Sequence, residues 1–476
     1  MAPKKTSPEH YFGVDDKQTV VLVEFAKSVT PASPAFTEDH QKRLIKDCKL
    51  KIIPFEMKEA SPAMAALSPD RYFLEVESED ARKPLDIIDN IEKVFKEEVV
   101  TIIPVPSAIP AIAPQSAEPA SGALPTPDLH MLQGYAGSAP EGLGFSDIAI
   151  LEGADGAGVT IIDLEGGWNL AHEALTPVQF NLWVGEASQH SGWVEHGTAV
   201  SSVMLSARDG IGISGLVPGA RGALASIYTG TPRRQRISQQ IDACRNLLSA
   251  GDVLLLEVQR PGPATNFISA ADQHGYLPTS FWPDVKESIR ACIADGIVVV
   301  EVAGNGGVDL DDESLQGAFD QTGSTITTLG AADSGSILVG AGHAPNAAPH
   351  GDGDNQGVPL ARSRIGFSNY GKRLDCQAWG EGVVSAGYGD AWGELGSNNA
   401  YSGRFFGTSS AGPIIAAAVA ATQGRHLYKY GQPVPPLLLR QVFASFGTPQ
   451  QRAEDDKLYI GPQPDLPMIF SALGLW

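Results

Sequence analysis

A short stretch rich in glycine, serine and alanine carries the first residue that could do chemistry. Residues 407–413 read Gly-Thr-Ser-Ser-Ala-Gly-Pro, and the small apolar run 414–420 that follows reads as a buried helix. Because proline is tolerated in the first turn of a helix, Pro413 predicts a helix start near Ser409. Such a start favours developing negative charge. Ser409 is therefore a candidate nucleophile, although small residues there could also serve only close helix packing.

Three other fragments carry groups that could work with this serine. Asp163 ends the predicted buried strand 158–163, and the carboxyl ends of parallel strands are where α/β folds place working groups. His196 lies at a predicted helix start, and Asn305 lies in a glycine-rich loop after the predicted strand 296–302. Taken singly, each has a plain structural explanation as a cap, a packing histidine or a turn residue.

Taken together, these side chains fit nucleophilic acyl transfer. Asp163 would orient His196, and His196 would take the proton of Ser409 as general base. The amide of Asn305 and the backbone N–H of Ser409 would bind the oxyanion. The chain order acid, histidine, serine differs from the orders of two other serine-hydrolase classes, and the Gly-x-Ser-x-Gly elbow is missing from the sequence.

At these residues the chain resembles the subtilisin-like serine peptidases, the subtilase or S8 family. The resemblance covers roughly residues 136–476, and its fragments follow the family's order: 159–163, 196–200, 299–305, 367–371 and 407–413. It implies an α/β fold with a parallel sheet flanked by helices, serine endopeptidase activity and the roles given above. The sedolisin relatives, which replace this histidine and asparagine by carboxylates, are excluded.

The loop after the predicted acid departs from the family pattern. Family members commonly follow the triad aspartate with Ser or Thr and then Gly. Here Leu164, Glu165 and Gly166 follow Asp163. We therefore expect a remodelled loop around the acid.

The predicted substrate-binding strand also departs from the family. It usually reads Ser-x-Gly, and here it reads Glu257-Val258-Gln259. An extended peptide would pair with this edge as an added strand. The resemblance further implies substrate contacts at Ala303 and Gly304.

Acidic residues near this strand suggest a specificity. Glu257 and the acidic loop 309–313 could select Arg or Lys before the scissile bond, as similar acids do in the kexin-type branch. The loop could equally be a solvated or ion-binding loop. The reaction is expected to need no cofactor, and a structural calcium site is conceivable although no ligand set can be assigned.

Residues 16–107 form a separate predicted domain behind a polar tail, 1–15. Its expected order β-α-β-β-α-β is that of a small α+β ferredoxin-like sandwich. The linker 108–135 follows, and seven prolines lie between Pro104 and Pro127. Such a domain commonly serves as a propeptide in this family, so we expect an intramolecular inhibitor with 101–108 as its tail in the cleft. A permanent partner-recruiting domain is the alternative.

Composition limits the partners. The net charge of −21 argues against nucleic acid and anionic membranes, which need basic patches. The sequence has no secretory signal or membrane-spanning stretch, which predicts a cytoplasmic protein, with export by another route left open. The four cysteines match no metal spacing and are expected to be buried thiols. Two other functions remain conceivable: a silent peptide-binding scaffold, and a peptide ligase or acyltransferase.

Overall fold

The computed structural model describes two compact units. The residues it describes are 18–25, 42–44, 46, 48, 52–56, 71–77, 84–95, 99–110, 125–229, 234–270, 272–315, 317–345, 360–394, 396–451 and 458–476. One unit comprises Met1–Ala108 with Arg260–Gly275, and the other comprises Ile109–Gln259 with Tyr276–Trp476. The predicted tail 1–15 and residues 111–124 of the predicted linker lie outside the described residues.

The first unit contains a four-stranded antiparallel sheet in the order β2-β3-β1-β4. Its strands are β1 (Gln18–Phe25), β2 (Ile52–Glu56), β3 (Arg71–Glu77) and β4 (Val99–Pro104). The helix α4 (Pro84–Phe95) begins at a proline and packs its buried apolar positions, among them Ile87 and Ile91, against this sheet. Of the predicted helix 37–48, residues 42–44, 46 and 48 are described; 42–44 and 46 are helical, and 48 lies in a bend.

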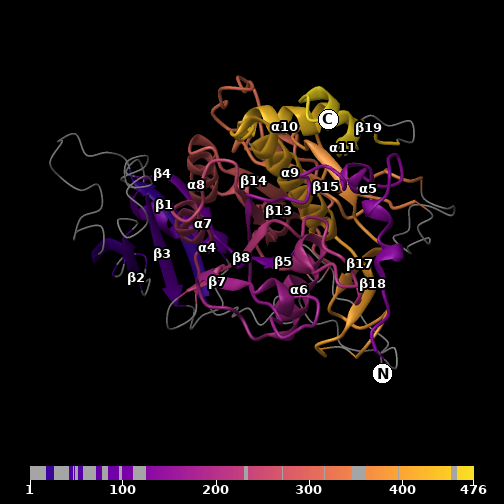
Figure 1. Ribbon diagram of the computed structural model, residues 1–476. Helices are drawn as coiled ribbons and strands as arrows, with labels where there is room; N and C mark the ends of the chain where they lie inside the picture. The colour runs from indigo at the N-terminus through magenta and orange to yellow at the C-terminus, as the bar shows by residue number, and fades with distance from the viewer. Residues whose placement is uncertain are drawn as a thin grey trace. The chain divides into compact units, whose positions relative to one another are not determined.

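The second unit is built on a seven-stranded parallel sheet in the order β16-β15-β14-β11-β6-β8-β7 (Figure 1). This confirms the predicted parallel sheet flanked by helices. The strands are β6 (Thr160–Glu165), β7 (Asn181–Val184), β8 (Arg221–Ser226), β11 (Val253–Leu256), β14 (Val298–Val302), β15 (Ile337–Gly342) and β16 (Cys376–Trp379).

The central strands are hydrophobic because helices cover both faces of the sheet. Every residue of β11 and β14 is buried, and their sequences are near-continuous apolar runs, as is typical of parallel strands. The helices α6 (Ser191–Leu205) and α9 (Thr408–Tyr430) pack against each other, and so do α7 (Ile237–Arg245) and α8 (Pro283–Ala294). All four cysteines are buried thiols, as predicted.

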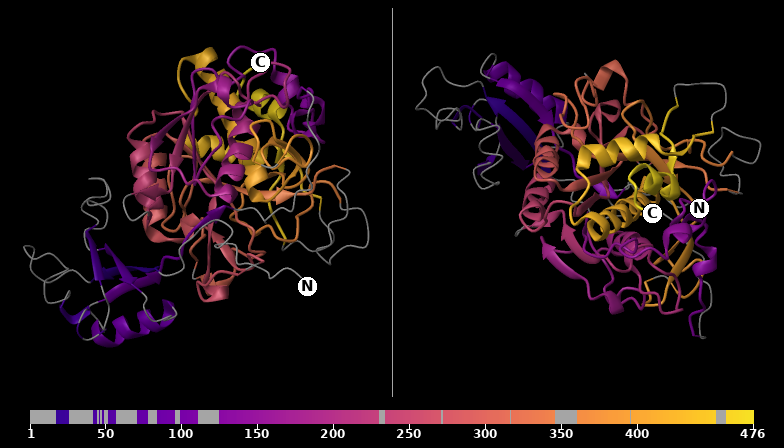
Figure 2. Two further views of the ribbon diagram at one scale, coloured as in Figure 1. Left: turned by 90° about the horizontal axis from the view of Figure 1, so that it is seen from below. Right: turned by 45° about the horizontal axis from the view of Figure 1, so that its top comes forward.

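Three neighbouring strands bring the candidate residues to one edge. β14, β11 and β6 are adjacent and parallel, so their carboxyl ends lie at the same edge of the sheet. Glu165 ends β6, Glu257 follows β11, and Asn305 lies just beyond β14. The helix α9 is the longest described in the chain, and the C-terminal helices α10 (Pro436–Ser445) and α11 (Leu466–Ala472) lie near it (Figure 2). Among the described residues, no helix has the length and apolar character needed to span a membrane.

The packing of α9 leads to a stability prediction at Gly424. A Cβ there would lie 2.4 Å from the carbonyl oxygen of Gly153, which is backbone and cannot turn away. Alanine gains about 1 kcal/mol of helix propensity over glycine, but overpacking costs about 1–3 kcal/mol. Because this clash is with backbone, the overpacking cost should lie in the upper part of that range, so we expect Gly424→Ala to lower the free energy of unfolding by about 1–2 kcal/mol in urea titrations.

Gly403→Ala is the matched control, because a Cβ at Gly403 would meet only the side chain of Ala391 at 3.8 Å. Its effect should stay within about 0.5 kcal/mol. Equal stability of the Gly424→Ala and wild-type proteins would contradict the close approach of α9 to the loop at Gly153.

Candidate active site

Ser409 lies in the first turn of α9. The helix begins at Thr408, and Ser409 is fully buried. Pro413 therefore falls in the second turn, one turn later than its expected place. Because proline has no N–H, it cannot donate to the carbonyl of Ser409, four residues earlier. Ser409, the candidate nucleophile, thus sits at a helix start, as predicted from its sequence.

Asn305 is fixed beside this helix start by its own side-chain oxygen. Oδ1 of Asn305 accepts hydrogen bonds from the backbone N–H and the Oγ1 hydroxyl of Thr408, at 3.0 and 2.9 Å. The backbone N–H of Asn305 donates to Oε1 of Gln259 at 2.7 Å. Since Oδ1 is held by donors, the network assigns the NH₂ group to the other side of the amide. This is the arrangement that an oxyanion donor requires.

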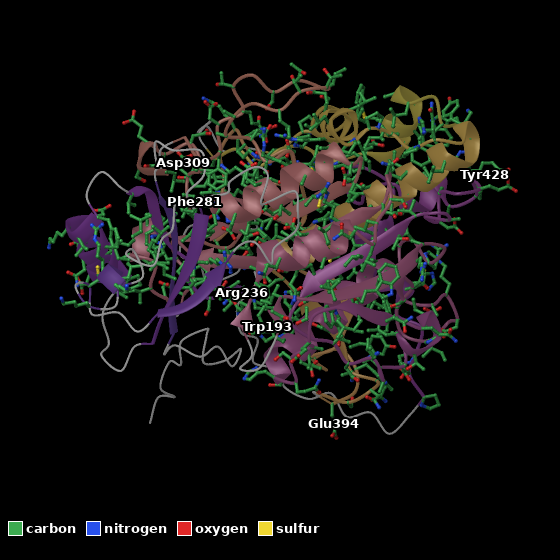
Figure 3. All side chains as sticks on the ribbon, turned by 90° about the vertical axis from the view of Figure 1, so that its left-hand side faces the viewer. Trp193, Arg236, Phe281, Asp309, Glu394 and Tyr428 are labelled. Atoms are coloured by element: carbon green, nitrogen blue, oxygen red, sulfur yellow. The ribbon has the colours of Figure 1, made fainter. Side chains whose placement is uncertain are left out.

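His196 lies in the second turn of α6 and is fully buried. The start of α6 is set by His190, whose ring accepts from the backbone N–H of Gly192, and by Trp193, whose Nε1 donates to the Tyr228 hydroxyl at 3.0 Å. Trp193 is labelled in Figure 3. The rings of Phe405 and His196 pack edge to face, with centroids 5.9 Å apart. These contacts fix the position of the imidazole.

The acid that contacts His196 is Glu165. Nδ1 of His196 lies 2.5 Å from Oε2 of Glu165, and both side chains are fully buried. This corrects the prediction that Asp163 orients the histidine. Oδ2 of Asp163 instead accepts hydrogen bonds from Nε1 of Trp168 at 2.8 Å and from Oγ of Ser201 at 2.9 Å.

The correction has a simple geometric reason. Side chains two residues apart point to the same face of a strand, so Asp163 and Glu165 both face α6. Two residues advance the chain by about 6.6 Å along the strand. Glu165 therefore reaches His196 near the carboxyl edge, while Asp163 reaches Ser201, which lies deeper in α6.

The sequence did carry a signal for Glu165. The usual pattern is an acid, a small residue and then glycine. Asp163 does not match this pattern, because leucine and glutamate follow it. Glu165 does match, because Gly166 and Gly167 follow. The apparent departure from the family pattern disappears when the acid is moved by two residues.

Burial shifts the pKa values of the titratable groups at this site. It raises the pKa of Asp163 to about 6, because the carboxyl is fully desolvated, although Trp168 and Ser201 oppose the shift. Burial also raises the pKa of Glu165 well above its usual range, and the nearby Asp163 and Glu257 raise it further. It lowers the pKa of His196. The imidazole is therefore held neutral and able to accept a proton.

The hydrogen bond through which Ser409 would pass its proton to His196 is not formed in this structure. Within the described part of the chain, Nε2 of His196 and Oγ of Ser409 have no hydrogen-bond partner. Hydrogen bonds between catalytic groups commonly tighten only when substrate is bound. The chemistry available is proton transfer to a neutral imidazole from a buried hydroxyl at a helix start.

Glu257 is brought to the site, but its side chain points toward α9. It is fully buried, and a Cβ on Gly412 would lie 2.3 Å from its Oε1. The carboxyl also interacts with the Ser409 side chain. This differs from the expectation that Glu257 lines a specificity pocket with the acidic loop.

The acidic loop uses its carboxylates locally. Asp311 Oδ2 accepts from the backbone N–H of Lys372, and Asp312 Oδ1 accepts from that of Ser314. Figure 3 shows Asp309 of this loop well apart from Trp193. Among the described residues, no cluster of three or more His, Cys, Asp and Glu side chains could hold a metal ion.

The predicted substrate-binding edge carries a segment of the chain itself. The strand β12 (Val258–Pro261) pairs antiparallel with β5 (Ile109–Pro110), with Val258 opposite Pro110 and Gln259 opposite Ile109. Nε2 of Gln259 donates to the carbonyl of Pro110 at 3.3 Å. The edge is therefore able to bind an extended strand, as its sequence predicted.

Ala303 and Gly304 also lie at the site, where their backbone groups hold the loops together. The carbonyl of Ala303 accepts from Nδ2 of Asn369 at 2.6 Å. The N–H of Gly304 donates to Oγ1 of Thr408 at 3.2 Å. Their predicted contacts with substrate stay a prediction.

Comparison with known proteins decides the family. A sequence profile of the subtilase family, Peptidase_S8, matches residues 174–441. The chain belongs to the subtilase family. It is a serine endopeptidase that acts on peptide or protein substrates. The matched segment of this subtilase contains His196, Asn305 and Ser409 but begins after β6, so it does not choose between Asp163 and Glu165.

Solved structures agree with this fold. Fervidolysin from Fervidobacterium pennivorans, described as a keratinolytic enzyme related to subtilisin, has a TM-score of 0.56 and 16% identity, over 95% of this chain and 61% of its own. The epidermin leader peptide processing serine protease EpiP from Staphylococcus aureus has a TM-score of 0.53 and 14% identity, over 96% and 99%. The patellamide maturation protease PatA has a TM-score of 0.45 and 19% identity, over 67% and 97%. A sequence search of curated proteins finds no match.

The two acids on β6 can be separated by substitution. We expect Glu165→Gln to lower kcat/KM by about 10²- to 10⁴-fold, because an amide can hold His196 in the wrong tautomer. Asp163→Asn should lower it by less than about tenfold, because its amide oxygen can still accept from Trp168 and Ser201. Initial rates on a quenched fluorescent peptide measure both, with circular dichroism to verify folding.

Asp163→Asn serves as the matched control, since it removes a buried carboxylate from the same face of the same strand. If the folded Asp163→Asn protein lost as much activity as Glu165→Gln, the assignment of Glu165 would fail.

Proposed function

We propose that this subtilase hydrolyses peptide bonds through an acyl-enzyme on Ser409, with His196 as general base and Glu165 as the orienting acid. The observation that carries the proposal is the 2.5 Å contact between Nδ1 of His196 and Oε2 of Glu165. It commits Nδ1 to the carboxyl and leaves Nε2 for the nucleophile.

The proposed first step forms the acyl-enzyme. Oγ of Ser409 attacks the scissile carbonyl carbon while its proton passes to Nε2 of His196. The tetrahedral oxyanion is bound by the Asn305 amide and the backbone N–H of Ser409, at the positive end of α9. The intermediate then collapses: the C–N bond breaks, and the leaving amine takes the proton from His196.

The second step releases the acid product. Water attacks the acyl carbon and gives its proton to His196, and the Ser409 oxygen leaves with that proton. Asp163 has a supporting role in this scheme. Through Trp168 and Ser201 it ties the loop after β6 to α6, which holds Glu165 and His196 in register.

The nucleophile is tested by covalent labelling. A fluorophosphonate should modify the purified full-length protein at Ser409, located by peptide mass spectrometry, because only an activated serine reacts with it. Ser409→Ala should abolish both the label and peptide hydrolysis. Ser410→Ala is the matched control, because its hydroxyl is bound to the carbonyls of Trp379 and Gly407. Labelling at any other serine would refute the assignment.

We also propose that the chain keeps itself latent through residues 109–110. The support is their pairing with Val258 and Gln259, the edge that a substrate strand would need. Ile109 is fully buried in this arrangement. On this proposal the preceding domain acts as an intramolecular inhibitor, and the residues that occupy the edge are those directly after the predicted tail 101–108.

Latency predicts a gain of activity when this strand is weakened. Ile109→Asp places a charge in a buried site and should raise the rate of Ser409 labelling in the full-length protein by at least about fivefold. Met131→Asp is the control, since Met131 is 81% exposed. Equal rates for wild type, Ile109→Asp and Met131→Asp would contradict inhibition by residues 109–110.

A further inference from the structure

Glu257 is a third buried carboxyl at the site and has no role in the scheme above. Both of its oxygens are buried, and neither has a hydrogen-bond partner by geometry among the described residues. Its Oε1 would lie 2.3 Å from a Cβ on Gly412, one turn of α9 after Ser409, so the carboxyl packs against the start of α9 beside Ser409. Buried polar atoms without partners are rare and call for a reason.

The groups that face Glu257 come from three elements. β6 contributes Asp163 and Glu165, α9 contributes Ser409, and α6 places His196 in the same buried region. Its charged neighbours on β6 are carboxyls like itself. Ionisation of Glu257 would therefore add negative charge to a desolvated cluster that is already acidic.

An ionised Glu257 would oppose the reaction in two ways. A carboxylate beside Ser409 would accept the hydroxyl proton in a hydrogen bond and so draw it away from Nε2 of His196. It would also repel the oxyanion that forms next to the same residue. A protonated Glu257 does not repel the oxyanion, and it competes less for the hydroxyl proton because a neutral carboxyl is a weaker acceptor than a carboxylate.

We propose that Glu257 is a positioning residue that must be protonated for Ser409 to react, so that the enzyme loses activity as the pH rises. The inference rests on the proposed role of Ser409. Burial raises the pKa of Glu257 well above its usual range, and the charge on Asp163 raises it further. Burial also lowers the pKa of His196. Between these two titrations both Glu257 and His196 are neutral, and this is the active window.

The test is the pH profile of fluorophosphonate labelling at Ser409 in the full-length protein, from about pH 4 to about pH 10. Wild type, Glu257→Gln, Glu257→Met and Glu257→Asp are compared. Glutamine keeps the shape without the charge, and methionine is an uncharged replacement that buried sites often accept. Glu257→Asp keeps a titrating group. Thermal unfolding of each variant identifies the folded ones.

We expect the wild-type rate to fall on the alkaline side. The ratio of the Glu257→Gln or Glu257→Met rate to the wild-type rate should rise at least about tenfold from the acidic to the alkaline end. Glu257→Asp should keep an alkaline fall. A purely structural role for Glu257 would scale the rate equally at every pH.

Two results would overturn this inference and leave the proposed function standing. One is a folded, uncharged variant whose profile runs parallel to that of wild type. The other is loss of labelling at every pH in folded Glu257→Gln and Glu257→Met while wild type is labelled, which would make Glu257 a required base. Absence of label at Ser409 in all four proteins at every pH, also when each carries Ile109→Asp to relieve latency, would instead refute the proposed function, and this inference with it.

Discussion

The short hydrogen bond between His196 and Glu165 is the interaction on which the rest of the site depends. Neither group can be solvated, so each has to satisfy the other. The contact at Nδ1 fixes the orientation of the imidazole. It leaves Nε2 as the nitrogen that could exchange a proton. The surrounding contacts serve this pair: Asp163 ties β6 to α6, and the oxygen of Asn305 ties the oxyanion loop to α9. Burying ionisable groups is costly unless they are paired, and this contact pairs the two.

Much of the second unit could be predicted from the sequence because its signals were local. The apolar runs of β11 and β14 indicated buried parallel strands, and the glycine-rich stretch before α9 indicated a helix start. His196, Asn305 and Ser409 each lie at the end of such an element, and their places follow from it. The pairing of an added strand at Val258 and Gln259 followed from the same logic, since an open edge binds extended chain.

The choice between two acids could not be made from the same signals. Asp163 and Glu165 share a strand and a face, so periodicity cannot separate them. What separates them is the depth at which α6 crosses β6, and that depth depends on packing between distant segments. The direction of the Glu257 side chain could not be predicted for a similar reason. It depends on the space left by the missing side chain of Gly412, which lies on α9.

The contact between Glu257 and Gly412 ties two distant positions together. A side chain on residue 412 would occupy the space that Oε1 of Glu257 fills, at 2.3 Å from the position of a Cβ. A long acid beside the nucleophile is therefore tolerated only with glycine in the second turn of α9. Substitution at either position alone would meet a steric or a cavity penalty, so related sequences should change 257 and 412 in concert. The third acid of this site thus depends on two residues that lie 155 positions apart in the chain, Glu257 and Gly412.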